Sequence, residues 1–276
     1  MKQPITLQPL PMAKPLSPGE EDCYSHDSPA LAAYAVASPL SESDLLLPSG
    51  SAGPVAVIVH AEPLEIRLAF IRKVYTILTL QLLTTFSFSL FFSLNTTARA
   101  LILSSTNALL LSMIASIATI CALTCLARRH PHNLLLLFLF TVLEAHLLSF
   151  VCAAYYERGL GAVVLQAVGL TAGVFLSLTA FTFQSKVDFT FLGAGLSTSL
   201  TLLLLWSAVQ MIFGYAPGAI YSLLSALVFS GYIVFDTFLL LRKLGPEDYV
   251  VAAVSLYLDV INLFLAVLRL LTNDER

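Results

Sequence analysis

Three acidic residues lie inside long apolar stretches of the sequence: Glu144, Asp236 and Asp259. A charged side chain inside a membrane is expensive, so an acid in such a stretch is a candidate for proton or ion chemistry. A lone buried acid can also stay neutral and serve only as a hydrogen-bonding group that packs the helices. Each of these three residues could therefore bind a proton, bind a cation or pack the helices as a neutral acid.

Asp236 and Asp259 are expected to lie close together. They fall on consecutive apolar stretches joined by a short link, so their helices are antiparallel neighbours. At 1.5 Å per residue, Asp236 lies about 8 Å from the end of its stretch and Asp259 about 14 Å into the next, a difference of about one helical turn. Ser255 and Asn262 share a helix face with Asp259, and Tyr232 shares one with Asp236. These five residues predict a polar seam that faces the bundle interior.

Two close carboxylates in a low dielectric cannot easily both ionise, so they share one proton. With that proton, the pair forms a hydrogen bond between two helices; without it, the pair repels or attracts a cation. Calcium prefers about six to eight oxygen ligands. Asp236, Asp259, Asn262 and water would bind it weakly, which suits a conduction path better than a storage site. We expect no cofactor other than calcium as the permeating ion.

The remaining acids give weaker signals. Glu144 is followed two residues later by His146, and we expect the two side chains to face different ways. Glu144 stays open between a pore or network role and a buried neutral acid. Glu247 and Asp248 lie beside two basic residues at a predicted cytosolic mouth. There we favour a solvated loop over a vestibule that collects cations.

The composition predicts an integral membrane protein. Of the 276 residues, 58% are hydrophobic and only 11% are charged, whereas soluble domains carry about 25% charged residues. The net charge of −3 gives no sign of nucleic-acid binding. The apolar runs are continuous rather than alternating, which excludes a β-barrel. They predict an all-α bundle of seven transmembrane helices in the lipid bilayer, at about 74–94, 107–127, 133–154, 160–183, 192–213, 219–241 and 250–271.

The charges outside the spans predict the orientation. Residues 1–63 are rich in proline and serine and predict a disordered cytosolic tail ahead of a membrane domain at 64–276. Basic residues gather on one side of the predicted spans, which places the N-terminus in the cytosol. A seventh full crossing places the C-terminus on the other side, whereas a re-entrant last stretch would return it to the cytosol. The basic residues of that side are Arg67, Arg72, Lys73, Arg128, Arg129, Lys186, Arg242 and Lys243.

Several segments resemble the transmembrane Bax inhibitor motif family, and within it the Golgi branch of the lifeguard proteins. The resemblance covers residues 64–271. Its segments are IRLAFIRKVYTILTLQLL (66–83), NLLLLFLFTVLEA (133–145), LTAFTFQSKVDFTFLGAGL (178–196), FSGYIVFDTFLLL (229–241) and PEDYVVAAVSLYLDVINLFLAVLRLL (246–271).

The resemblance implies a seven-helix protein of the Golgi or endoplasmic reticulum that leaks calcium into the cytosol and dampens apoptosis. The family's pH-sensing aspartates match Asp236 and Asp259. A bacterial relative latches one aspartate to an arginine of the second helix. Here the only arginines near that position are Arg128 and Arg129, at the helix end, so we do not expect the latch to carry over unchanged.

Two other functions compete with a pH-sensitive calcium leak. A non-conducting anti-apoptotic scaffold would bind calcium channels or apoptosis regulators, and a homo-oligomer stays open. An intramembrane aspartyl protease also uses two membrane aspartates. Its usual GxGD context is absent, because Asp259 follows Leu256-Tyr257-Leu258 and Asp236 follows Val234-Phe235. We therefore expect a protein that is not an enzyme.

Overall fold

The computed structural model describes residues 64–215 and 218–274, and these residues form helices without strands. The expected tail at 1–63 lies outside the described residues. Seven of the described helices are long and apolar enough to cross a membrane, as the sequence predicts. The helices are α1 (Leu64–Leu94), α2 (Thr96–Ser104), α3 (Thr106–Leu126), α4 (His132–Glu157), α5 (Gly161–Gln184), α6 (Leu192–Phe213), α7 (Ala219–Arg242), the 3-10 turn η3 (Pro246–Asp248) and α8 (Tyr249–Asp274).

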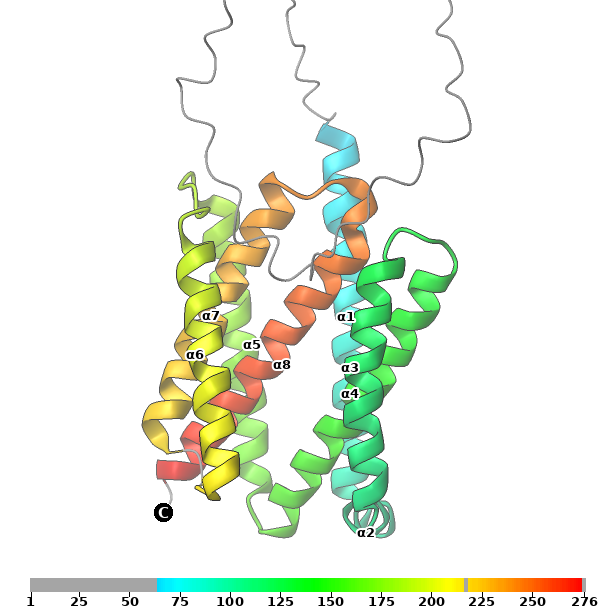
Figure 1. The fold of residues 1–276 in the computed structure, drawn as a ribbon, viewed down its shortest axis with the longest axis vertical. Helices are drawn as coiled ribbons and strands as arrows, with labels where there is room; N and C mark the ends of the chain where they lie inside the picture. Colours follow the sequence, from blue (N-terminus) through cyan, green and yellow to red (C-terminus); the bar gives the residue numbers. More distant parts are fainter. Residues whose placement is uncertain (1–63, 216–217, 275–276) are drawn as a thin grey trace, which may run out of the picture.

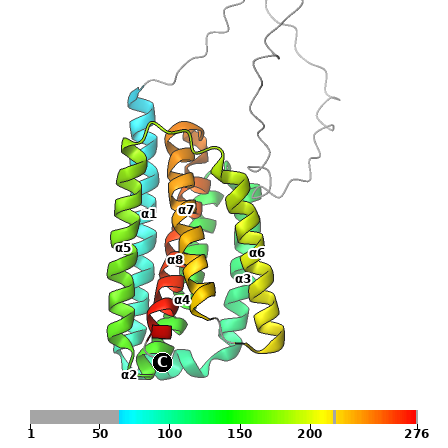
Figure 2. The same cartoon turned by 90° about the vertical axis from the view of Figure 1, so that its left-hand side faces the viewer.

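The helix α8 runs through the middle of the bundle, with α5, α6 and α7 on one side and α1, α3 and α4 on the other (Figure 1). In α8, 67% of the most apolar segment is buried by the rest of the protein, against 17–39% in the other six spans. Because lipid covers the outer helices, their outward faces stay apolar. The view in Figure 2 shows the same long helices aligned along one axis.

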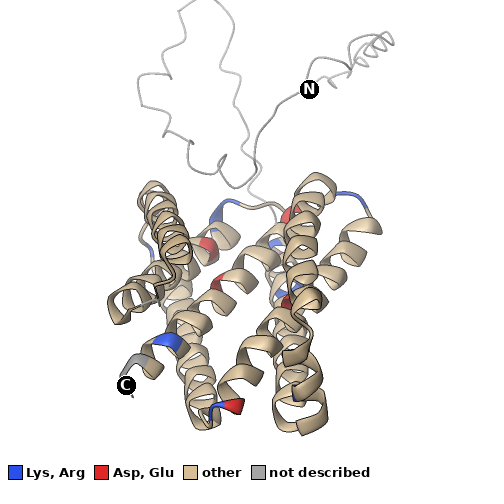
Figure 3. Ribbon diagram, turned by 60° about the horizontal axis from the view of Figure 1, so that its bottom comes forward, with Lys and Arg blue, Asp and Glu red and all other residues tan. Residues whose placement is uncertain are grey.

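The end of α8 lies at the opposite end of the bundle from the start of α1 (Figure 1). The last stretch therefore crosses the bundle fully and does not turn back. Charged residues are sparse along the helices and gather mainly near their ends (Figure 3). That distribution is the one expected when the middle of each helix lies in hydrocarbon.

The link between the first two spans contains α2, a helix that the apolar pattern does not predict. The side-chain oxygen of Asn95 accepts hydrogen bonds from the backbone amides of Thr97 and Ala98, at 3.0 and 3.1 Å. Such an N-cap satisfies backbone donors that have no partner within the helix. Arg99 of α2 also pairs with Glu157 at the end of α4, at 2.8 Å. These contacts fix the link across the end of the bundle.

Two glycines bring α6 close to α7. A Cβ atom at Gly231 would lie 2.7 Å from Cδ2 of Leu196, and one at Gly193 would lie 2.9 Å from Cζ of Phe235. Both distances are too short for a side chain without a shift of its neighbour. Within the described chain α6 packs chiefly on α7, so these close contacts set the position of α6.

Arg67 fastens α1 to the end of α7. Its guanidinium donates three hydrogen bonds to the backbone oxygens of Leu240, Leu241 and Leu244, at 3.1, 3.0 and 2.7 Å. The last carbonyls of a helix have no partner within the helix, and a positive charge there also favours the helix dipole. The contact joins the first span to the helix that carries Asp236.

Candidate functional site

A cavity of about 690 Å³ lies between α6, α7 and α8, and polar side chains gather within its mostly apolar lining. All five residues of the predicted polar seam line it. Tyr232 and Asp236 come from α7, and Ser255, Asp259 and Asn262 come from α8. The structure therefore brings together the side chains that depth and helix spacing associate.

The two aspartates of the cavity contact each other. The Asp236 carboxyl group lies in hydrogen-bonding contact with Asp259 and with Ser255. Asp259 is 6% exposed, and Asp236 is partly buried. A contact between two carboxyl groups is attractive only when one of them carries a proton and donates it. Within the described chain, Oδ2 of Asp259 has no hydrogen-bond partner, and a proton shared with Asp236 would satisfy it.

The antiparallel α7 and α8 hairpin places this pair. Asp236 lies six residues before the end of α7 at Arg242, and Asp259 lies ten residues after the start of α8 at Tyr249. At 1.5 Å per residue, Asp236 lies about 9 Å from the end of α7 and Asp259 about 15 Å from the start of α8, a difference of about 6 Å. In Figure 1, α8 is inclined to the long axis of the bundle, which shortens its rise along that axis.

Neutral oxygen atoms supply the rest of the polar groups in the lining, beside the apolar side chains. The amide nitrogen of Asn262 donates to the backbone oxygen of Leu258 at 2.8 Å, which leaves the amide oxygen available to the cavity. Sequence reasoning missed the wall supplied by α6, with Ser197, Thr198 and Thr201. These hydroxyl groups donate to backbone oxygens one turn back, at 3.1, 2.9 and 2.9 Å. Their lone pairs remain available as acceptors. The cluster Ser197-Thr198-Ser199 within an apolar span is the signal that could have identified this wall.

The lining favours a proton or a hard cation over a tightly held metal. Its polar atoms are carboxyl, hydroxyl and amide oxygens, the ligand types that calcium and magnesium prefer. Among residues 64–215 and 218–274, no group of three or more His, Cys, Asp or Glu side chains could hold a metal ion. Two acids and neutral oxygens are a set from which only weak and reversible binding of a cation would be expected.

Glu144 does not line this cavity. It lies on α4, where its Oε1 accepts a hydrogen bond from the Ser116 hydroxyl of α3 at 2.5 Å. His146 also bonds to α3, through Nδ1 and the Ser112 hydroxyl at 2.9 Å. The expectation that the two α4 side chains face different ways is therefore wrong. Both side chains are long enough to reach the same neighbouring helix.

The expected mouth residues lie in the turn η3. Asp248 pairs with Arg128 at 2.9 Å, and Glu247 is exposed. In the part of the chain that the structure describes, no ion pair joins Arg128 or Arg129 to the cavity aspartates. The structure therefore places Arg128 as a tie between the α3–α4 link and η3, and it leaves Arg129 exposed.

Sequence reasoning also missed a cluster around Tyr249, at the start of α8. The Tyr249 hydroxyl bonds to Nε2 of His130 at 2.5 Å and to the amide nitrogen of Asn133 at 3.0 Å. The ammonium group of Lys73 lies 3.3 Å from the centre of the Tyr249 ring, a cation–π contact. The cluster joins α1, α4 and α8 at the end where η3 lies.

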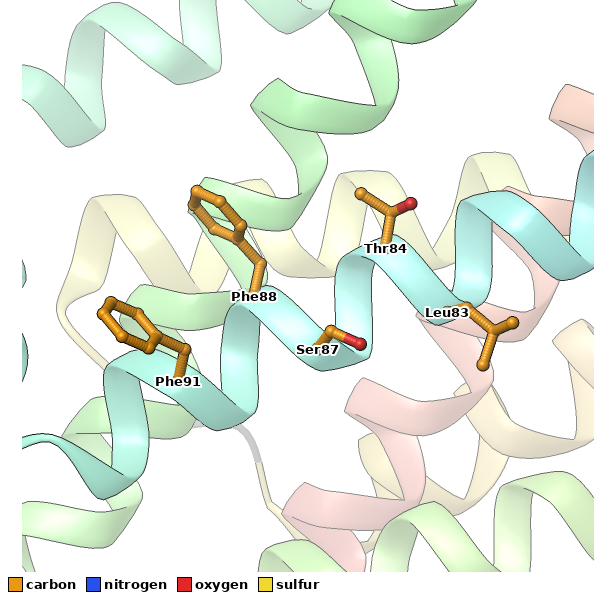
Figure 4. A pocket seen from close by; sticks show the side chains of 5 residues that line it. All are labelled: Leu83, Thr84, Ser87, Phe88 and Phe91. Carbon is orange, nitrogen blue, oxygen red and sulfur yellow. The ribbon is translucent and has the colours of Figure 1, made fainter.

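A second hollow, of about 420 Å³, lies along α1 (Figure 4). All five of its lining residues come from that one helix, and most are apolar side chains exposed on the outside of the bundle. A surface of this kind fits acyl chains rather than a polar ligand. Its lining residues are Leu83, Thr84, Ser87, Phe88 and Phe91.

Comparison with known proteins relates the whole membrane domain to one family. Residues 67–276 match the family described as inhibitor of apoptosis-promoting Bax1. The Golgi anti-apoptotic protein of Vaccinia virus (strain Lister) is 45% identical over 220 residues, which cover 79% of this chain and 91% of the viral protein. Protein lifeguard 4 of Mus musculus is 42% identical over 214 residues, covering 77% of this chain and 88% of the mouse protein. Bax inhibitor 1 of Schizosaccharomyces pombe is 39% identical over 212 residues, covering 75% of this chain and 77% of the yeast protein.

Proposed function

This chain belongs to the family of the inhibitor of apoptosis-promoting Bax1, and from that premise we propose that it is an anti-apoptotic membrane protein that leaks calcium. The proposed path runs from the lumen of an intracellular store to the cytosol. The proton on the Asp236–Asp259 pair controls it. The loss of stored calcium would in turn lower the signal that promotes apoptosis.

The cavity between α6, α7 and α8 is the observation that carries this proposal. It joins two acids in contact with each other to a wall of neutral oxygen atoms, in the middle of helices that cross the membrane. A conduction path needs binding that is strong enough to admit an ion and weak enough to release it. Two carboxyl groups with hydroxyl and amide neighbours fit that requirement.

The shared proton provides the gate. With one proton, the pair is a hydrogen bond that ties α7 to α8. Without it, two negative charges lie in contact, and their repulsion favours entry of a cation and water. Calcium flux should therefore rise as the pH rises.

The charges support the proposed orientation, and the relatives support the proposed location. The basic residues at the end where α1 begins favour the cytosol for that end. The C-terminal end of α8 then faces the lumen. One similar viral protein is named a Golgi anti-apoptotic protein, which supports a Golgi membrane, with the endoplasmic reticulum as the next choice.

Calcium efflux from proteoliposomes tests the proposal. The purified full-length protein is compared with the double variant Asp236→Asn/Asp259→Asn from about pH 5.5 to 8, a range that brackets the titration of a carboxylate pair sharing a proton. Asp188→Asn, which replaces an exposed acid outside the cavity, is the matched control. We expect flux that increases with pH in the parent and in the control, and flux without that dependence in the double variant.

Two results would contradict the proposal. Equal flux and equal pH dependence in parent and double variant would remove the aspartates from the gate. Absence of flux at any pH, with the protein shown to be folded, would favour the non-conducting scaffold. Deletion of residues 1–60 would then test whether the tail carries the contacts of that scaffold.

A further inference from the structure

The contact between α3 and α4 contains another membrane acid, the partly buried Glu144. Ser112 and Ser116 lie one turn apart on α3, and each bonds to an ionisable side chain of α4, His146 and Glu144 respectively. Within the described residues, these are the two side-chain hydrogen bonds that join α3 to another helix. Because α3 packs chiefly on α4, the charge states of these partners bear directly on how α3 is held.

Glu144 lies among neutral groups. It forms no ion pair with any of the residues that the structure describes, and Ser116 is its hydrogen-bond donor. On its own helix His146 turns to Ser112, and on α8 the neutral phenol of Tyr257 lies near enough to interact electrostatically with Glu144. On α1, the uncharged Gln81 donates to Thr141 of α4, and the uncharged Thr85 bonds to Tyr257 of α8.

The other helices packed against α4 add no cation next to Glu144. The sequence of α5 contains no charged residue, and Arg99 of α2 pairs with Glu157 at the far end of α4. An ionised carboxylate with a single hydroxyl donor in such surroundings is costly, whereas a neutral carboxylic acid with the same donor is not. The closed contact therefore fits the protonated acid.

We propose that Glu144 is a second proton-binding site and that α3 packs closely on α4 only while Glu144 carries its proton. Loss of the proton leaves a charge that needs water, and the accessible source of water is the seam between α3 and α4. The ligand is a proton, and the responding element is the peripheral helix α3.

This site is separate from the aspartate pair. Tyr257 faces α1, where its hydroxyl bonds to Thr85 at 2.8 Å, whereas Asp259 faces the cavity beside α6 and α7. Tyr257 and Asp259 therefore contact different neighbours of α8, and Glu144 does not line the cavity. The proposal does not depend on calcium conduction.

Thermal unfolding of the full-length protein in detergent tests the site without any measurement of flux. The parent is compared with Glu144→Gln, which keeps the shape of the neutral acid and cannot ionise, from about pH 5.5 to 8, where a buried carboxyl group titrates. At one pH unit above the pKa of the carboxyl group, the ionised form is favoured tenfold over the protonated form, which is about 1.4 kcal/mol. For a domain of this size, that energy shifts the midpoint of thermal unfolding by about 3–6 °C. As the pH rises, we expect the unfolding midpoint of the parent to fall by this amount relative to that of Glu144→Gln.

Three further variants locate the effect. Asp236→Asn removes a different membrane acid, so it should leave unchanged the pH dependence of stability that Glu144 causes. Ser116→Ala keeps the acid and should retain the pH dependence. His146→Gln should also retain it. A difference between parent and Glu144→Gln that is constant across the pH range would overturn the proposal, as would a pH dependence that disappears in His146→Gln.

A chemical probe tests the unaltered protein. Dicyclohexylcarbodiimide is an apolar reagent that modifies protonated carboxyl groups in membranes, and mass spectrometry identifies the modified residue. We expect modification of Glu144 that decreases as the pH rises through its titration. Modification that is independent of pH, or no modification of Glu144 at any pH, would contradict the proposal even if Glu144→Gln does not fold.

Discussion

Replacing Arg67 should loosen the end of α7 and with it the position of Asp236. The guanidinium of Arg67 donates three hydrogen bonds to backbone oxygens at that end, at 2.7, 3.0 and 3.1 Å. Asp236 lies less than two turns along α7 from two of these carbonyls, those of Leu240 and Leu241. Arg67→Ala removes all three donors, and Arg67→Lys keeps the charge but loses the planar arrangement that serves three acceptors at once.

The expected loss is moderate because the site is only partly buried. A hydrogen bond to a charged group contributes about 1.5–3 kcal/mol, so three such bonds set an upper limit well above the net effect. Arg67 lies near the end of the bundle, and water can replace at least some of the lost donors. We expect Arg67→Ala to lower the stability by about 2 kcal/mol, which is about 4–8 °C in the unfolding midpoint.

Thermal unfolding in detergent measures this loss, and Arg72→Ala is the matched control. Arg72 carries the same charge on the same helix but is exposed. We expect the control to change the midpoint by less than about 2 °C, since surface substitutions stay within about 0.5 kcal/mol. If Arg67→Ala and Arg72→Ala had equal effects, the stabilisation would come from charge alone and the proposed clamp on α7 would be wrong.

Two other predictions follow from the links and contacts of α6. Gly231→Val should displace Leu196 and α6, with a cost of about 1–3 kcal/mol in stability. Gly195→Val should be tolerated, because a Cβ atom at Gly195 would meet no neighbouring atom within 4 Å. The thermal unfolding midpoints of the two variants test this difference, and equal losses would contradict the close approach of α6 to α7. Hydrogen bonds from the hydroxyl and backbone amide of Thr190 lower the pKa of Asp188, so Asp188 stabilises the folded link above the ordinary carboxyl pKa and loses this effect as the pH falls through the lowered value. The stability difference between parent and Asp188→Ala should therefore vanish in strong acid, and a difference that grows on acidification would refute this account.

The polar seam could be predicted from sequence because it rests on two regular quantities. Helical rise gives the depth of each acid, and helical periodicity gives the neighbours that share its face. Together they associate Asp236 and Asp259 with Tyr232, Ser255 and Asn262, and all five line one cavity. The number of spans follows from the apolar runs in the same way.

Other contacts could not be predicted because they depend on how helices far apart in sequence are arranged. Arg67 bonds to backbone oxygens more than 170 residues away, and a backbone acceptor leaves no trace in residue type. The same holds for Tyr249 with His130, where no charge pattern marks the pair. The cap of α2 by Asn95 does have a local signal, but the apolar pattern alone does not include it.

The energies involved indicate which wall of the cavity would respond to loss of the proton. Two unit charges about 4 Å apart repel by about 4 kcal/mol at the effective dielectric of a protein. Val250, Ala253 and Leu256 of α8 are completely buried, and disturbing even one large core side chain costs about 2–5 kcal/mol. Separation of α7 from α8 would disturb several such side chains at once, so repulsion of that size is not enough to separate the two helices. We expect it to be relieved instead by a cation and water in the cavity, and we expect α6, the least buried of the seven spans, to be the wall that moves to admit them. Displacement of α6 through Gly231→Val should therefore raise calcium flux at low pH, where the proton still ties the aspartates; unchanged flux in a folded variant would place the moving wall elsewhere.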